Sequence, residues 1–307
     1  MRIKHIIITG SSGMIGTYLM EELLRKKYNV IGVDKEKNKW NIDLNKKTIR
    51  LDLKNKKHVL KKLPKKIDLV IHLAANARVY NLVKDPSLAR DNLEIIFNIL
   101  EYVRLNNIKR FIFSSSREVY GNSRIITHKE KEVHLDLCES PYTASKIGGE
   151  ALVHSYAQCF NLNYIIVRLS NVFGCYDDSD RVMPLFINQC IKNKDLNIFG
   201  KGKVLDFTYI HDCVSGIIKC INNFNKAKND IYNLAFGKGN SILKVANIIR
   251  KELNSKSKIR IKKNRTGEVV RYIANIDKAK RKLGYSPKHT IEQGVKKTVH
   301  WYLNNMH

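Results

Sequence analysis

Two residues four positions apart, Tyr142 and Lys146, stand in the segment SPYTASK and have the types needed for proton transfer. Residues four apart on one helix share a face, so the ammonium group is expected near the phenol. A nearby positive charge lowers the pKa of a phenol, which is about 10 when unperturbed. A phenol with a lowered pKa can take a proton from a sugar or alcohol hydroxyl. The spacing also arises by chance, so it indicates acid–base chemistry only together with other signals.

The first of these signals is a serine triplet, Ser114 to Ser116, at the end of the apolar run KRFIFSSS. The second is a set of glycines at 10, 13 and 16, which follow the first apolar run and precede a helical pattern. Glycines with this spacing permit a tight turn, close approach to a pyrophosphate and close helix–strand packing. The N-terminus of the following helix offers free N–H groups to phosphates. This arrangement predicts a dinucleotide site in preference to an ordinary glycine turn.

Two aspartates follow the next predicted strands. Asp34 ends the second strand, where a carboxylate accepts hydrogen bonds from both ribose hydroxyls and repels a 2′-phosphate. This favours NAD over NADP, although Lys35 beside it weakens the preference. Asp52 follows the third strand and is a candidate for the adenine amino group, with a solvated turn residue as an equal alternative.

Six apolar runs alternate with helical patterns in the first half of the chain, which is typical of a parallel sheet with crossover helices. The runs are KHIIIT, NVIGVD, TIRLDL, DLVIHLA, KRFIFSS and NYIIVRLS. Helices are expected near residues 14–27, 55–62, 86–106, 142–160, 181–193, 212–223, 242–253 and 290–304. The predicted fold is α/β, a Rossmann-type doubly wound parallel sheet with a smaller, interleaved C-terminal substrate domain.

The regular alternation ends near residue 170, which suggests a domain boundary. We expect an NAD-binding domain over 1–170, with 204–236 returning to it because DFTYIHDCVSGI has the pattern of the first domain. Residues 171–203 and 237–307 are expected to form the smaller domain that binds the substrate.

The composition excludes several classes. The net charge is +28, but the lysines are spread through every predicted helix and turn without a nucleic-acid-binding motif, so we expect a solvated basic surface and no nucleic-acid partner. No apolar run is long enough to span a membrane, and the N-terminus lacks a signal peptide, so a cytoplasmic protein without a membrane partner is expected. The six cysteines and ten histidines lack metal-ligand spacing, and we expect no metal.

Eight blocks in order resemble the extended short-chain dehydrogenase/reductase family, and within it the NAD-dependent nucleotide-sugar epimerase/dehydratase group. They are TGSSGMIG, HLAA at 72–75, DPSLARDNLEIIFN, SSSREVYG at 114–121, SPYTASK, RLSNVFG, GKGKVLDFTYIHD and RTGEVVRYIANIDKAKRKLGYSP. The resemblance covers essentially the whole chain. UDP-hexose 4-epimerases are the members that it resembles most.

The resemblance implies a role for each matched residue. Ser116 would hold the reacting sugar hydroxyl, Tyr142 would be the acid and base, and Lys146 would bind the nicotinamide ribose. The implied NAD site comprises Gly10, Ser12, Gly13, Met14, Ile15, Gly16, Asp34, Asp52, Leu53, Leu73, Ala74, Ala75, Asn92, Tyr142 and Lys146. The implied substrate site comprises Ser116, Asn171, Arg181, Asn197, Phe199, Arg265 and Tyr272. The family also implies a homodimer through the helices near 86–106 and 142–160.

Three departures from the family pattern bear on the reaction. Arg117 replaces the aspartate of 4,6-dehydratases, whereas Glu118 remains, as in glucuronate decarboxylases, and is a catalytic candidate with a structural ion-pairing role as the alternative. Leu205 replaces an arginine that holds the diphosphate in many relatives, which leaves Arg265, Arg271 or Arg181 to compensate. Tyr272 is a bulky residue where bulk limits room for an N-acetyl group, which favours non-acetylated sugars.

The implied activity is therefore that of a nucleotide-sugar 4-epimerase, most simply for UDP-glucose/UDP-galactose or UDP-glucuronate, through a transient 4-keto sugar. A UDP-glucuronate decarboxylase, or another dehydratase or reductase of the family, is the alternative. A non-catalytic dinucleotide- or nucleic-acid-binding protein is a remote alternative, because a binding module does not need Ser116, Tyr142 and Lys146 together.

Overall fold

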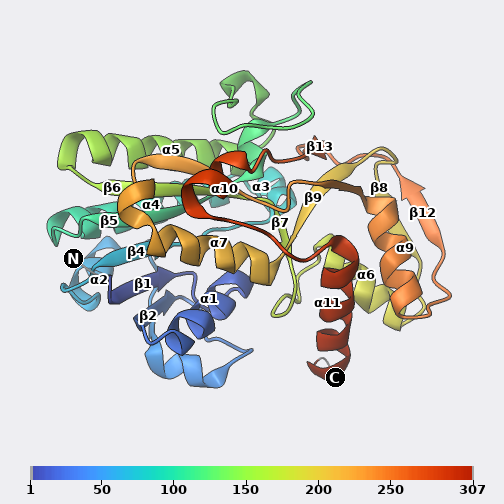
Figure 1. Ribbon diagram of the computed structural model, residues 1–307, viewed down its shortest axis with the longest axis horizontal. Helices are drawn as coiled ribbons and strands as arrows, with labels where there is room; N and C mark the ends of the chain where they lie inside the picture. Colours follow the sequence, from blue (N-terminus) through green and yellow to red (C-terminus); the bar gives the residue numbers. More distant parts are fainter. Residues whose placement is uncertain (1–2, 306–307) are drawn as a thin grey trace.

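The computed structural model describes residues 3–305, which are organised around a seven-stranded parallel sheet (Figure 1). Its strand order is β10-β6-β5-β4-β1-β2-β3. The strands are β1 (His5–Thr9), β2 (Asn29–Asp34), β3 (Thr48–Arg50), β4 (Leu69–His72), β5 (Arg110–Ser116), β6 (Asn163–Leu169) and β10 (Asp230–Leu234). The six predicted strands are confirmed, and β10 adds a seventh at the edge beside β6.

The direction of strand addition reverses at the centre of this sheet. The chain moves from β1 outward to β2 and β3, then returns to add β4 on the other side of β1. In open parallel sheets a ligand binds at the carboxyl ends of the strands where the order reverses. The topology thus places the glycine turn after β1 and the HLAA block after β4 at one ligand-binding crevice.

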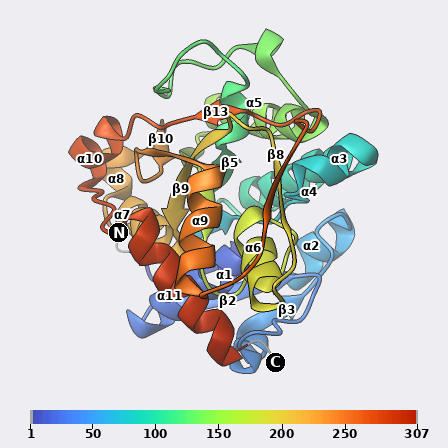
Figure 2. The ribbon, with the colours of Figure 1, turned by 90° about the vertical axis from the view of Figure 1, so that its right-hand side faces the viewer.

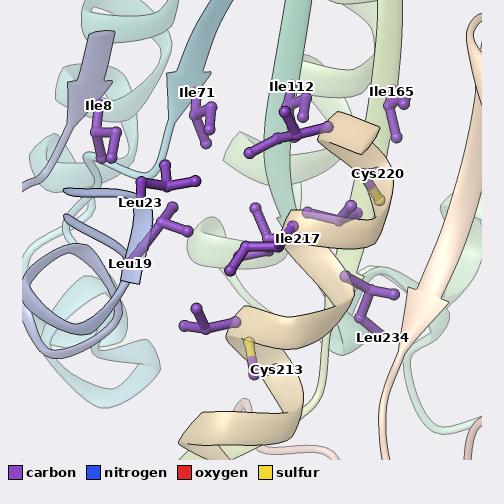
Figure 3. Close-up of a cluster of buried hydrophobic side chains, with 14 of the residues drawn as sticks. Ile8, Leu19, Leu23, Ile71, Ile112, Ile165, Cys213, Ile217, Cys220 and Leu234 are labelled. Atoms are coloured by element: carbon purple, nitrogen blue, oxygen red, sulfur yellow. The ribbon is translucent and has the colours of Figure 1, made fainter. Parts of the chain in front are cut away.

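Helices cover both faces of the large sheet. The α-helices of the described residues, on the sheet and elsewhere, are α1 (Met14–Arg25), α2 (Lys56–Lys62), α3 (Val79–Lys84), α4 (Ser87–Leu105), α5 (Pro141–Phe160), α6 (Val182–Ile191), α7 (Ile210–Asn222), α8 (Phe224–Ala227), α9 (Ile242–Glu252), α10 (Asp277–Leu283) and α11 (Ile291–Asn305). Alternate residues of each strand serve the two faces. Ile8 faces α1 and α7, where Leu19 and Ile217 meet it in one buried cluster (Figure 3). Ile7 lies in the opposite cluster, under α2, α4 and α5.

The rest of the chain forms a smaller body beside the sheet, seen in front in Figure 2. Strand β9 (Val204–Tyr209) is its centre and pairs with β7 (Asn171–Phe173), β11 (Gly239–Ser241) and β13 (Arg271–Tyr272). Strand β8 (Leu196–Phe199) pairs with β12 (Ile259–Lys262). Helices α6, α9 and α11 pack around these strands. Within 204–236, β9 therefore belongs to the smaller body, whereas α7 covers the large sheet and β10 joins it.

Among residues 3–305, no helix has the length and apolar character that a membrane crossing needs.

Candidate active site

A cavity of about 970 Å³ lies where the smaller body meets the carboxyl ends of β1, β2, β4 and β5. The glycine turn and Asp34 line one part, Ser116, Tyr142 and Lys146 line the middle, and residues of α6, β8 and the segment near Arg265 line the rest. The cavity therefore joins the predicted dinucleotide site to the predicted substrate site.

The glycine turn is shaped by close backbone packing. Gly10 has a positive φ of 72°, and a Cβ there would lie 2.8 Å from the backbone nitrogen of Ala74. A Cβ on Gly16 would lie 2.1 Å from the carbonyl oxygen of Gly10. No side chain caps the N-terminus of α1, so the N–H groups of its first turn are open to a ligand. These features fit the pyrophosphate of a dinucleotide.

Asp34 is fixed at the cavity wall by two backbone N–H groups. Ser12 N donates to Oδ2 and Glu36 N donates to Oδ1, each at 2.9 Å. Burial raises the pKa of the Asp34 carboxyl, and these hydrogen bonds work in the opposite sense. The carboxylate is thus oriented beside the glycine turn, as the prediction of a ribose contact requires.

Helix α5 carries the proton-transfer pair into the middle of the cavity. Ser140 caps this helix by accepting from Thr143 N at 3.2 Å, and Pro141 occupies its first turn. The phenol of Tyr142 shares a hydrogen bond with the Ser116 side chain. Lys146 Nζ donates to the carbonyl oxygen of Ser114 at 2.7 Å and lies 5.8 Å from the centre of the Tyr142 ring. The three residues named from the sequence therefore form one cluster.

The pKa values of Tyr142 and Lys146 are shifted by burial. Burial raises the pKa of the Tyr142 phenol, so the prediction of a lowered pKa is wrong for this structure. The hydrogen bond with Ser116 acts in the lowering direction but is outweighed. Burial also lowers the pKa of Lys146 to about 8. The four-residue spacing predicts that the two groups are close, whereas the cost of burying them depends on the tertiary structure.

A buried ion pair holds α5 against the sheet behind this cluster. Arg168 on β6 donates from Nε and Nη2 to the two oxygens of Glu150 on α5, at 2.9 and 2.6 Å. Ser115 Oγ donates to Glu150 Oε1 at 2.5 Å. Because Glu150 and Lys146 are four apart on α5, this pair fixes the helix turn that presents the lysine.

A second buried ion pair lines the cavity directly beside Ser116. Arg117 Nη2 lies 2.6 Å from Glu118 Oε1, and Arg117 Nε donates to Asn171 Oδ1 at 3.1 Å. Asn171 Nδ2 in turn donates to the carbonyl oxygen of Asp206 at 3.0 Å. Burial raises the pKa of Glu118, and Arg117 opposes that change. The arginine that departs from the dehydratase pattern is therefore the partner of the glutamate that remains.

The far part of the cavity gathers arginines. The Arg265 guanidinium lies 4.0 Å from the centre of the Phe199 ring. Arg181, which directly precedes α6, has its Nη1 3.9 Å from Asp177 Oδ2. Arg78 also lines this part and pairs with Asp180, yet it was not predicted. Its place three residues after the HLAA block is the sequence signal that could have identified it. Arg271 is exposed and does not line the cavity, so it does not replace the arginine missing at Leu205.

Two predicted site residues lie behind the cavity wall. Asn92 accepts from Asn76 N at 2.7 Å and donates to Ser145 Oγ at 3.1 Å, so it supports the loop after β4. Tyr272 is fully buried under the Arg117 guanidinium, which lies 5.9 Å from its ring centre. This placement corrects the expectation that Tyr272 limits the sugar pocket directly. The other predicted residues line the cavity, and their binding roles remain predictions.

Comparisons with known proteins agree with this geometry. The family described as "NAD dependent epimerase/dehydratase family" matches residues 6–235. A UDP-glucuronate 4-epimerase of Thermodesulfobacterium geofontis is 30% identical, over 98% of this chain and 97% of its own. A UDP-glucose 4-epimerase of Thermotoga maritima, solved with UDP-glucose, has a TM-score of 0.91 and 27% identity, covering 98% of this chain and 99% of its own.

A third relative extends the range of sugars. A UDP-N-acetylglucosamine 4-epimerase of Methanobrevibacter ruminantium, solved with UDP-N-acetylmuramic acid, has a TM-score of 0.89 and 29% identity, and the match covers 100% of both chains. The family drawn from the motifs, the Rossmann-type fold, the dependence on NAD and the prediction of an enzyme are thereby confirmed.

Proposed function

The chain belongs to the NAD-dependent epimerase/dehydratase family, and we propose that it is a UDP-hexose 4-epimerase. The observation that carries the proposal is one continuous cavity, in which Ser116, Tyr142 and Lys146 lie between the glycine turn and the arginines near Arg265. A nucleotide sugar bound with its diphosphate toward those arginines would present its sugar to Tyr142. Guanidinium groups suit a diphosphate because they donate in a planar fork.

The roles of the chain's own residues follow from their positions. When bound along the glycine turn and Asp34, NAD supplies the acceptor and donor of hydride at a sugar carbon. Tyr142 takes the proton from the sugar 4-hydroxyl at its phenolic oxygen and later returns it. Ser116 positions that hydroxyl through the hydrogen bond it shares with Tyr142. Lys146 holds its ammonium 5.8 Å from the centre of the Tyr142 ring, and a positive charge at this position works against the burial that raises the pKa of the phenol.

The test uses the purified protein without added cofactor. We expect it to convert UDP-glucose or UDP-glucuronate to the corresponding 4-epimer, monitored by NMR of the sugar protons. No conversion of either nucleotide sugar would contradict the proposal. With cofactor added, net reduction of NAD would instead indicate a dehydrogenase, and net oxidation of NADH would indicate a reductase.

Glu118 supports a second candidate, a UDP-glucuronate decarboxylase or a dehydratase of the same family. This carboxyl lines the cavity, and burial raises its pKa, as suits a group that holds a proton. Release of carbon dioxide from UDP-glucuronate would favour this candidate. Its ion pair with Arg117 favours the epimerase, because a paired carboxylate is harder to protonate.

A homodimer through α4 and α5 is part of the proposal. Three large apolar side chains on these helices are exposed: Phe97 by 40%, Leu105 by 53% and Phe160 by 45%. Exposed apolar side chains gathered on two neighbouring helices fit a subunit interface. A molecular mass of one chain by light scattering would contradict it. A division at residue 170 into two domains and a cytoplasmic location remain predictions.

A further inference from the structure

The proposed function leaves open whether the sugar is neutral or carries a carboxylate. The two classes differ by one negative charge close to the reacting carbon. The cavity wall at this point is formed by Arg117 and Glu118, which directly follow Ser116 in the chain. Their exposed fractions are 8% and 4%, so water screens their charges poorly.

The charge of Arg117 is already compensated. Its Nη2 lies 2.6 Å from Glu118 Oε1, and its Nε donates to Asn171 Oδ1. A carboxylate brought to this wall therefore meets Glu118 as well as Arg117. Two carboxylates that share one buried site repel each other. The sugar carboxylate would lose its hydration on binding, and the described residues of this wall offer it no unpaired cation to offset that cost.

Two further cations of this wall, Lys203 and Arg265, also have an acidic partner. Lys203 and Glu268 form an ion pair at 2.5 Å, and both lie close enough to Glu118 to influence its pKa. Arg265 lies 3.9 Å from the same glutamate and stacks on Phe199. The lining around Glu118 is thus composed of paired charges.

A neutral sugar matches this lining better. Arg117 Nη1 and Glu118 Oε2 are buried and lack a hydrogen-bond partner among residues 3–305, so the pair retains one donor and one acceptor. A sugar hydroxyl can accept from a guanidinium and donate to a carboxylate, so a neutral sugar can supply a partner to each of these two groups. A sugar carboxylate only accepts, and it leaves Glu118 Oε2 without a donor.

We propose that Arg117 and Glu118 form a charge-neutral specificity pair that admits a neutral nucleotide hexose and discriminates against a nucleotide uronate. The proposal rests on the proposed epimerase function and narrows its substrate class. It gives a function to the departure at Arg117 and to the glutamate that remains at position 118, because each charge cancels the other.

The test compares kcat/KM of the NAD-containing enzyme for UDP-glucose and UDP-glucuronate. We expect the wild type to favour UDP-glucose by about ten-fold or more. Glu118→Gln keeps the size of the side chain but frees the Arg117 charge, so the preference should shift toward UDP-glucuronate by about ten-fold. The matched control Arg117→Met/Glu118→Gln removes both charges and should lose that shift. Bound NAD and melting temperature establish that each variant is folded.

Several outcomes overturn the proposal. One is wild-type turnover of UDP-glucuronate equal to or above that of UDP-glucose. Another is an unchanged preference in folded Glu118→Gln. Release of carbon dioxide from UDP-glucuronate overturns both this proposal and the epimerase. If the wild type converts neither sugar, the proposed epimerase function is wrong. The specificity proposal is then tested by the competition of UDP-glucose and UDP-glucuronate for binding. Equal affinities overturn the specificity proposal, and weaker binding of UDP-glucuronate supports it.

Discussion

The ion pair between Arg168 and Glu150 allows a quantitative test of how the catalytic helix is held. The Arg168 side chain is 3% exposed, and two of its hydrogen bonds go to Glu150. The other two go to neutral groups, Tyr120 Oη at 3.0 Å and Glu130 O at 2.7 Å. Glu150→Gln leaves one acceptor oxygen in place but removes the compensating charge. Removing one partner of a buried pair costs about 3–5 kcal/mol, and the retained oxygen places this variant at about 3 kcal/mol.

Urea unfolding at pH 7 measures this loss. The control Glu150→Gln/Arg168→Met lacks both charges, so it should lose less stability than the single variant. Glu22→Gln is a surface comparison, because its partner Arg25 is 69% exposed and such pairs contribute about 1 kcal/mol or less. A loss below about 1 kcal/mol in Glu150→Gln, or a greater loss in the double variant, would refute the reasoning. The single variant should also lose turnover, because α5 carries Tyr142 and Lys146.

Three further predictions concern the cavity. Tyr142→Phe should lower kcat by about 10²–10⁴-fold while NAD released on denaturation stays equimolar; full turnover would overturn its role as acid and base. Asp34→Ala should weaken NAD binding measured by calorimetry and reduce the preference over NADP, because the ribose hydroxyls lose their acceptor; unchanged affinity would contradict the assignment. Lys146 has a pKa of about 8 in the fold against 10.5 ordinarily, so the cost of burying its charge is full below pH 8 and is relieved toward pH 10.5. In urea unfolding without cofactor, the wild type should therefore gain about 3 kcal/mol over Lys146→Met across that interval, and a flat difference would contradict the shift.

Much of the fold is readable from the chain because its central strands are buried on both faces. Ile6, Ile7 and Ile8 are all fully buried, two on one side of the sheet and one on the other, so the strand appears as an uninterrupted apolar run. Strand β10 is an edge strand that pairs with β6, and about sixty residues separate the two, including the central strand of the smaller body and α7. Its pairing depends on that long connection, which periodicity does not report.

Side-chain direction explains the residues that were misplaced. The offset of Tyr272 from Arg265 was read from the sequence, but neighbouring residues of a strand point to opposite sides. Tyr272 on β13 points inward, where it stacks on His128 with ring centres 5.5 Å apart, and Arg271 beside it is exposed. Arg78 was not predicted because it lies in the loop after β4, where no strand or helix periodicity indicates the direction of a side chain. Its place on the cavity wall depends on the path of that loop and on its ion pair with Asp180.

The pair at positions 117 and 118 shows why a motif departure has to be interpreted together with its neighbour. Read singly, Arg117 removes the aspartate of a dehydratase, and Glu118 keeps a decarboxylase-like carboxyl. In the structure Arg117 also holds Glu118 Oε1 at 2.6 Å and so opposes its protonation. A guanidinium partner favours the ionised carboxylate, which has no proton to give to a leaving hydroxyl, whereas burial raises the pKa of Glu118. The arginine thus acts against dehydration twice, by the residue it replaces and by the residue it binds, which leaves proton exchange at Tyr142 as the chemistry this cavity supports best.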